Sequence, residues 1–505
     1  KVLLRISNLK QYFPLKGGRF VKANDGITLD IYEGETFGLV GESGCGKSTL
    51  GRTILQLYHQ TYGRTMYYGR SLDDLAPKYV IDTVRNLKSR RTKLRELEQK
   101  RDKLEADYAK LSEKEQYAKH GELDTARKLA EDALLDITKI VGGFLVVDDL
   151  DPVIAAYSKD YAIARKLSSM EEKRQELQVD VDDAEYAKKT AEEAGKSGKD
   201  DQLQKAQEKL KQCDDQIAAL RAQLDAGRKE IEALRAPYAN DPEFQKYEAY
   251  RDDGIDLARL EYNEMRRLRR DMQLIFQDPY SSLNPRMSVG QIISEGMQAH
   301  NMIKKKDARM QEMVLKIMDD CGLAPYFLHR FPHQFSGGQR QRIGIARALA
   351  TKPKFVVCDE AVSALDVSIQ AQIINLLLDL KEQQNLTYMF ITHDLSVVKY
   401  ISDRVGVMYL GTMVELAAAD EIFHHPIHPY TEALLNAIPT TDTVGAKELS
   451  ILEGDIPSPV NPPKGCKFHT RCKYCTEICT QVVPEWEEVR PNHFVACHHK
   501  LEAKE

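Results

Sequence analysis

The sequence predicts an α/β fold that is interrupted by a long helical insertion and followed by a cysteine-rich C-terminal segment. Short apolar strands that run into glycine-containing turns occur before residue 79 and again after residue 264. Between them, the chain is dominated by Lys, Glu, Gln, Ala, Leu and Asp. We therefore expect a domain formed by residues 1–78 and 264–430, an inserted region at 79–263, and an extension at 431–505.

Length and composition limit the class of protein. A chain of 505 residues is too long for one core, so two or three domains are expected. The 72 basic and 77 acidic residues give a net charge of −5, which lacks the basic signature of nucleic-acid binding. No apolar run reaches the roughly 18 residues that span a bilayer, and we expect no signal peptide before the first strand. Scattered single cysteines indicate a reducing, cytosolic environment.

The first motif is GESGCGKS at Gly41–Ser48, which matches the pattern G-x-x-x-x-G-K-[ST]. The buried strand TFGLV precedes it and the helical segment STLGRTILQLY follows. Glycines let backbone N–H groups point at phosphate oxygens, and the helix N-terminus also favours anions. We expect Lys47 to reach nucleotide phosphates and Ser48 to ligate Mg²⁺. The expected nucleotide-binding residues are Gly41, Ser43, Gly44, Cys45, Gly46, Lys47, Ser48 and Thr49.

Three later strands end in polar side chains that suit nucleotide hydrolysis. Gln277 follows the strand MQLIF and is expected to ligate Mg²⁺. The strand FVVCDE ends in Asp359, expected in the Mg²⁺ shell, and Glu360, the expected general base, a role that typically contributes about 10²–10⁴-fold. His393 ends the strand YMFITH and is expected to contact the γ-phosphate or position the attacking water.

A second small-residue turn precedes the helical segment IGIARALA. Its residues Ser336, Gly337, Gly338 and Gln339 permit close backbone approach to an anion. They lie far from Lys47 in sequence, so we expect them to face the γ-phosphate bound by a partner subunit. Asp366 closes the turn that follows Glu360.

The insertion has a seven-residue apolar repeat. One series comprises Leu203, Leu210, Ile217, Leu224 and Ile231, and a second follows three residues later at Ala206, Cys213, Leu220, Gly227 and Leu234. This pattern predicts a coiled coil. A turn is expected at 195–201, and residues 141–152 interrupt the helical pattern. We expect an antiparallel helical hairpin or small bundle, which serves either as a docking arm or as a solvated decoration.

Five cysteines near the C-terminus are spaced too densely for isolated thiols of a cytosolic protein. Because disulfides are disfavoured in that compartment, a metal site is the natural interpretation. Four thiolates can hold Zn²⁺ or an iron–sulfur cluster, and the spacing alone does not decide between them.

Taken in order, these motifs resemble those of ATP-binding-cassette ATPases, over roughly residues 1–78 and 264–425. The resemblance implies ATP and Mg²⁺ as ligands, and a head-to-tail dimer in which the phosphate loop of one subunit and SGGQ of the other enclose each ATP. It also implies an aromatic residue that stacks on adenine, for which Phe13 is the candidate and Tyr12 the alternative.

A finer resemblance is to the oligopeptide/dipeptide importer branch and its F-type ATPase subunit. It is carried by residues 277–287, 335–349, 363–372 and 428–439. It implies two membrane permease subunits, a paralogous D-type ATPase or a second copy as dimer partner, and an extracytoplasmic solute-binding protein. Peripheral association with the cytoplasmic face of the cell membrane is implied, and nucleic acid is not. The chain departs from this pattern at Ala361, where proline is expected, and in its long insertion.

The same resemblance implies a [4Fe–4S] cluster held by Cys466, Cys472, Cys479 and Cys497, with zinc as the alternative and Cys475 as a spare thiol. A different class, the SMC-like and DNA-repair ATPases, also carries coiled-coil or zinc-bearing insertions. In SMC-like proteins, however, the coiled coil follows the glutamine corresponding to Gln277, whereas here it precedes it. The transport interpretation is therefore the leading one.

Overall fold

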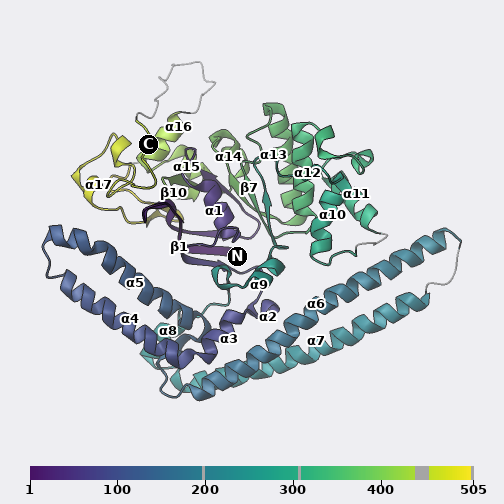
Figure 1. Ribbon diagram of the computed structural model, residues 1–505, viewed down its shortest axis with the longest axis horizontal. Coiled ribbons are helices and arrows are strands. Elements are labelled where there is room, and N and C mark those ends of the chain that lie inside the picture. Colours follow the sequence, from purple (N-terminus) through teal and green to yellow (C-terminus); the bar gives the residue numbers. More distant parts are fainter. Residues whose placement is uncertain (196–199, 305–308, 438–453, 502–505) are drawn as a thin grey trace. The chain divides into compact units, whose positions relative to one another are not determined.

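The computed structural model describes residues 1–195, 200–304, 309–437 and 454–501 (Figure 1). The chain divides into two compact units. The first is formed by residues 1–69 and 265–505, and the second by residues 70–264. Each unit has hydrophobic clusters of its own.

The first unit is built on an eight-stranded sheet whose order is β11-β12-β10-β9-β3-β8-β7-β6. Neighbouring strands from β9 to β6 are parallel, whereas β10, β12 and β11 add antiparallel pairs. All residues of β3, β7 and β8 are buried, as expected for parallel strands that are covered on both faces. The strands are β3 (Thr36–Val40), β6 (Met272–Ile275), β7 (Phe355–Asp359), β8 (Thr387–Ile391), β9 (Arg404–Tyr409), β10 (Thr412–Ala418), β11 (Glu487–Arg490) and β12 (His493–Val495).

A smaller antiparallel sheet of the same unit contains β2 (Phe20–Tyr32), β1 (Val2–Pro14) and β4 (Tyr62–Tyr67), in that order. The helices of this unit are α1 (Lys47–Ile54), α10 (Val289–Ala299), α11 (Met310–Asp320), α12 (Gly337–Leu349), α13 (Val367–Gln384), α14 (Leu395–Ile401), α15 (Ala419–His424), α16 (Pro429–Asn436) and α17 (Glu477–Gln481). Helix α9 (Tyr262–Leu268) spans the boundary between the two units.

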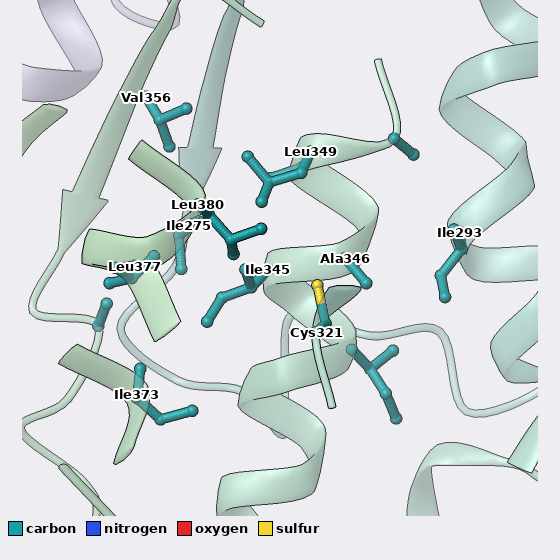
Figure 2. Close-up of a cluster of buried hydrophobic side chains, with 14 of the residues drawn as sticks. Ile275, Ile293, Cys321, Ile345, Ala346, Leu349, Val356, Ile373, Leu377 and Leu380 are labelled. Carbon is teal, nitrogen blue, oxygen red and sulfur yellow. The ribbon is translucent and has the colours of Figure 1, made fainter. Parts of the chain in front are cut away.

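Helix α12 lies in the middle of the larger hydrophobic core (Figure 2). Its Ile345, Ala346 and Leu349 point toward side chains from β6, β7, α10 and α13. Ile345 and Ala346 are completely buried. Because close-packed interiors tolerate little displacement, this packing fixes the position of the N-terminus of α12.

Two predicted boundaries were wrong. The helix after the phosphate loop ends at Ile54 rather than near residue 58, because Gln56 adopts a left-handed φ of 54°. The small residues expected to form a turn before α12 instead form its first turn, since the helix begins at Gly337 with Ser336 as its N-cap.

The second unit is helical. Helices α4 and α5 pack together, as do α6 and α7, so two helix pairs are present (Figure 1). All ten residues of the predicted seven-residue repeat lie in α7 and are buried or half-buried. The predicted turn between α6 and α7 falls mostly on residues 196–199, outside the described residues. The elements are α2 (Leu72–Leu75), α3 (Lys78–Arg85), α4 (Leu87–Tyr108), α5 (Glu113–Val141), α6 (Asp151–Glu193), α7 (Asp200–Arg235), α8 (Pro242–Glu248) and β5 (Ile255–Asp256).

Phe144 lies at the centre of the core that joins these helices, in a short 3₁₀ segment (Gly142–Val146) after α5. Its ring meets those of Tyr157 and Phe244 edge to face, at centroid distances of 6.2 and 5.6 Å. The guanidinium carbon of Arg235 lies 4.6 Å from the ring centroid. The segment that interrupts the helical pattern in the sequence is therefore part of a packed core.

Candidate functional site

The phosphate loop connects the C-terminal end of β3 to α1. Gly41 and Gly46 have φ values of 148° and 102°, which side-chain-bearing residues rarely adopt. A Cβ atom on Gly41 would lie 2.2 Å from the carbonyl oxygen of Met408, and one on Gly46 would lie 2.1 Å from that of Ala23. Glycine is therefore required at both ends of the loop, for backbone conformation and for space.

The side chain of Lys47 is buried within this loop. Its amine donates to the carbonyl oxygens of Gly41 at 2.7 Å and Glu42 at 3.0 Å. The neighbouring Cys45 is also buried, and burial raises the pKa of its thiol, which keeps the sulfur uncharged beside the lysine. Ser43 and Gly44 are exposed at the tip of the loop, while Thr49 lies in the first turn of α1.

The loop meets the end of β7 through Ser48. The Ser48 hydroxyl donates to Asp359 Oδ1 at 2.5 Å, and Arg52 Nη2 donates to Asp359 Oδ2 at 3.1 Å. Asp359 is completely buried, and each of its two carboxylate oxygens accepts one of these hydrogen bonds. Two oxygen donors of the kind that Mg²⁺ prefers therefore lie side by side.

Glu360 is surrounded by two other predicted site residues. Gln277 Nε2 donates to Glu360 Oε2 at 2.7 Å, and His393 Nδ1 lies 3.7 Å from Glu360 Oε1. The backbone of Glu360 has a φ of 48°, and its N–H donates to the carbonyl oxygen of Ile391 in β8. Such left-handed conformations in non-glycine residues cluster at functional sites. The parallel strands β6, β7 and β8 thus bring three side chains from distant segments together.

Ser336 caps α12 by accepting a hydrogen bond from the backbone N–H of Gln339, whose side chain bonds back to the Ser336 N–H. Gly338 is required here because a Cβ atom would lie 2.6 Å from Ile369 of α13. Asp366 is the N-cap residue of α13. No hydrogen bond or ion pair within the described part of the chain joins the segment 336–339 to the phosphate loop.

The segment after Gln277 is held against α12 by two arginines. Arg347 donates to the carbonyl oxygen of Ser282 at 2.6 Å, and the guanidinium of Arg340 lies over the ring of Tyr280, 4.7 Å from its centroid. The loop that begins at Gln277 is therefore connected to the helix that presents Ser336 and Gly337.

The two aromatic candidates for an adenine contact differ in their surroundings. The Tyr12 hydroxyl donates to Asp25 Oδ1 at 2.5 Å, and burial together with this carboxylate raises the Tyr12 pKa above its ordinary value. The Phe13 ring packs edge to face on Tyr58, just beyond α1, at 5.3 Å. Both rings are half-buried.

Comparison of the sequence with known protein families gives two matches. Residues 24–245 and 244–363 match the ABC transporter family, and together these ranges span more than half of the chain. The chain belongs to the ABC transporter family. Residues 414–479 match a second family, the oligopeptide/dipeptide transporter C-terminal region.

Two relatives from Bacillus subtilis illustrate this kinship to ABC transporters. The oligopeptide transport ATP-binding protein AppF is 52% identical over 250 residues, which cover 48% of this chain and 75% of AppF. The protein YkfD is 34% identical over 498 residues, which cover 98% of this chain and 95% of YkfD. These matches favour transport over the SMC-like alternative.

The ABC transporter chain carries its cysteine cluster between α16 and the C-terminal end of the described residues. Cys466 N–H donates to the carbonyl oxygen of Cys479 at 2.8 Å. Burial, together with smaller contributions from the thiols of Cys466, Cys472 and Cys479, raises the pKa of Cys497 to about 12. Cys479 is buried, Cys466, Cys472 and Cys497 are half-buried, and Cys475 is exposed. Across the described ranges, no group of three or more His, Cys, Asp or Glu side chains is placed to hold a single metal ion.

Sequence analysis missed five residues that lie around the phosphate loop. Arg471 forms a two-pronged ion pair with Glu42, and Lys467 pairs with Asp25 at 3.1 Å. Arg471 and Lys467 belong to the cysteine segment, so only the fold reveals their proximity to the loop. A further missed residue, Arg52, follows Ser48 by four positions on α1, a spacing that places both on one helix face.

Every helix within the described ranges is too short or too polar to serve as a membrane-spanning segment.

Proposed function

We infer that this chain is the ATP-hydrolysing subunit of a membrane importer for di- and oligopeptides. One observation carries the inference: the phosphate loop, Asp359 and Glu360 converge at the carboxyl ends of parallel strands. The match to the oligopeptide/dipeptide transporter C-terminal region supports peptides as the transported solute.

The proposed mechanism assigns one role to each element of the site. The phosphate loop and Lys47 bind the ATP phosphates, with the N-terminus of α1 contributing its positive end. Ser48, Asp359 and Gln277 would hold Mg²⁺, which would supply positive charge to offset the charge of the ATP phosphates. Phe13 stacks on adenine in this proposal, with Tyr12 as the alternative.

Glu360 polarises the attacking water as general base. Its carboxylate lies between the Gln277 amide and the His393 ring, which orient it and the water. A general base in such a position contributes about 10²–10⁴-fold to the rate. Glu360 adopts a left-handed backbone conformation directly after β7.

The site is completed by a second ATPase subunit. The N-terminus of α12, with Ser336, Gly337, Gly338 and Gln339, binds the γ-phosphate held by the partner, and Asp366 lies at the same interface. The partner is a paralogous D-type subunit or a second copy. ATP binding closes the dimer, and hydrolysis reopens it.

The complex also contains two permease subunits and an extracytoplasmic solute-binding protein, and the ATPase lies peripherally at the cytoplasmic face of the membrane. The segment from Gln277 to Pro285 contacts the permeases, and Arg340 and Arg347 pass its movement to α12. We assign residues 1–78 and 264–430 to the ATPase domain, 79–263 to an inserted antiparallel coiled coil, and 431–505 to the extension.

The extension is proposed to hold a [4Fe–4S] cluster through Cys466, Cys472, Cys479 and Cys497. Support comes from the spacing of the four cysteines and from the match of residues 414–479 to the oligopeptide/dipeptide transporter C-terminal region. When bound, such a cluster supplies covalent cross-linking of the segment and a redox-active centre. Anaerobic purification is expected to yield a brown protein with bound iron and sulfide. A colourless protein that contains one equivalent of zinc would refute the cluster assignment.

The catalytic assignment is tested with Glu360→Gln, which preserves shape and removes the base. We expect turnover to fall by about 10²-fold or more, ATP binding to persist, and the closed dimer to accumulate in ATP. Glu421→Gln, on the surface of α15, is the matched control. Near-normal hydrolysis by Glu360→Gln would remove Glu360 from its role.

The transport assignment is tested by purifying the tagged chain from native membranes in mild detergent. Recovery of two multi-span permeases and a related ATPase is the expected result. Recovery only from the soluble fraction, together with DNA-processing proteins, would refute it.

A further inference from the structure

The cysteine segment reaches the phosphate loop through a buried arginine. Arg471 Nη1 donates to Glu42 Oε2 at 2.7 Å, and Nη2 donates to Glu42 Oε1 at 3.1 Å. The Arg471 side chain is 4% exposed and that of Glu42 is 24% exposed. Paired, two-pronged geometry of this kind gives the strongest and most directional form of ion pair.

Glu42 is part of the phosphate loop itself. It directly follows Gly41, and its carbonyl oxygen accepts a hydrogen bond from the Lys47 amine. A carboxylate in this position places negative charge next to a site that is built to bind phosphate anions. Uncompensated, it would repel the ligand, because charges in a partly buried site are only weakly screened.

The segment that carries Arg471 is held rigidly in place. Phe468 is buried against the rings of Tyr409 and Tyr430, at centroid distances of 5.2 Å from each. The Tyr430 hydroxyl in turn accepts a hydrogen bond from the Glu42 N–H at 2.9 Å. The backbone and the side chain of Glu42 are therefore both bound by the C-terminal part of the chain.

A second contact lies on the other side of the loop. The Lys467 amine donates to Asp25 Oδ2 and to the carbonyl oxygen of Leu410, both at 3.1 Å. Asp25 follows Asn24, whose side chain donates to the carbonyl oxygen of Gly46 at the end of the phosphate loop. The segment from Lys467 to Arg471 thus braces the loop near its first and its last residues.

We propose that Arg471 is a positioning residue of the nucleotide site, which neutralises Glu42 and so sets the ATP affinity of the phosphate loop. The proposal rests on the ATP site described under the proposed function. The proposal gives the C-terminal extension a role in nucleotide binding, which its cysteine motif does not indicate. The effect is on binding and not on the chemical step, since Arg471 touches neither Glu360 nor Asp359.

The test is equilibrium binding of ATP to the purified full-length chain, together with kcat and KM. Arg471→Met leaves Glu42 unpaired, so we expect ATP affinity to fall by on the order of tenfold, equivalent to about 1.4 kcal/mol, and KM to rise while kcat changes little. Glu42→Gln removes the repelling charge and is expected to bind ATP at least as tightly as the native chain. The double variant is expected to lie within about twofold of the native chain.

A purely structural ion pair would give a different pattern, because either single substitution would then weaken binding to the same extent. Weakened binding by Glu42→Gln, or a double variant as weak as Arg471→Met, would overturn the proposal. The Glu42→Gln measurement keeps the test decisive even if Arg471→Met does not fold. Arg490→Met is the matched control, because Arg490 pairs with Glu421 of α15, away from the loop. A native chain that binds no ATP would instead refute the proposed function.

Discussion

The core around Phe144 allows a quantitative test of whether the inserted unit is stabilised independently of the ATPase unit. Phe144→Ala removes a ring that is 1% exposed and in contact with two aromatic rings and a guanidinium. Phe→Ala in a core costs about 3–5 kcal/mol. Each aromatic pair adds about 0.5–1.5 kcal/mol beyond its buried area, so the upper part of that range is expected, about 4–5 kcal/mol.

Two spectroscopic signals separate the two units. Far-ultraviolet circular dichroism is dominated by the long helices of the second unit, whereas the single tryptophan of the sequence, Trp486, lies in the first unit and stacks on Phe494. With a urea dependence of about 2 kcal/mol per molar, the helical transition of Phe144→Ala is expected to shift downward by about 2 M. The Trp486 transition and the ATPase activity are expected to stay unchanged.

The control for this experiment is Leu129→Ala, at a position on α5 that is 45% exposed, for which a change below about 0.5 kcal/mol is expected. A helical shift below about 0.5 M would refute the packing argument. Equal shifts of the helical and tryptophan signals would refute the independence of the two units.

Three further predictions concern the ATPase unit. Gly46→Ala introduces a Cβ 2.1 Å from the Ala23 carbonyl oxygen and is expected to abolish measurable ATP binding, whereas Gly44→Ala, which also has positive φ but open space, is expected to retain it. Ser48→Ala removes one oxygen donor and is expected to raise the Mg²⁺ concentration needed for half-maximal hydrolysis by about tenfold, with unchanged ATP binding in the absence of metal. Burial lowers the pKa of His428 to about 4, so the unfolded chain takes up this proton first as the pH falls. Stability is therefore expected to decrease between about pH 6.5 and 4, by up to about 3 kcal/mol, in urea titrations, and His428→Asn, which retains the helix cap, is expected to flatten that decrease.

The residues at the strand ends were predictable because one rule covers them all. Gln277, Glu360 and His393 each follow an apolar run, and the carboxyl ends of parallel strands meet at one edge of a sheet. The order of the strands did not need to be known for this. The geometry around Glu360, by contrast, depends on its left-handed backbone, which leaves no mark in the sequence because glycine or asparagine is the usual signal.

The contacts of the cysteine segment were not predictable. The spacing of the cysteines predicts a metal site. Arg471, in contrast, is one of many arginines, and its partner Glu42 lies 429 residues away in the sequence. In the insertion, the seven-residue repeat indicated the packed face of α7. The repeat did not indicate that Gly142–Val146, which interrupts the helical pattern, would form the centre of a core. A short apolar run does not show which other segments it packs against.

The ion pair between Arg471 and Glu42 also bears on the synthesis of the protein. Glu42 leaves the ribosome 429 residues before Arg471, which at about 5–20 residues per second corresponds to roughly 20–90 s of synthesis. Throughout this interval the phosphate loop carries an unneutralised carboxylate. We therefore expect a chain truncated before Arg471 to bind ATP about tenfold more weakly than the full chain, as proposed for Arg471→Met. If the proposal holds, the protein reaches its full ATP affinity only after its C-terminal segment has been synthesised.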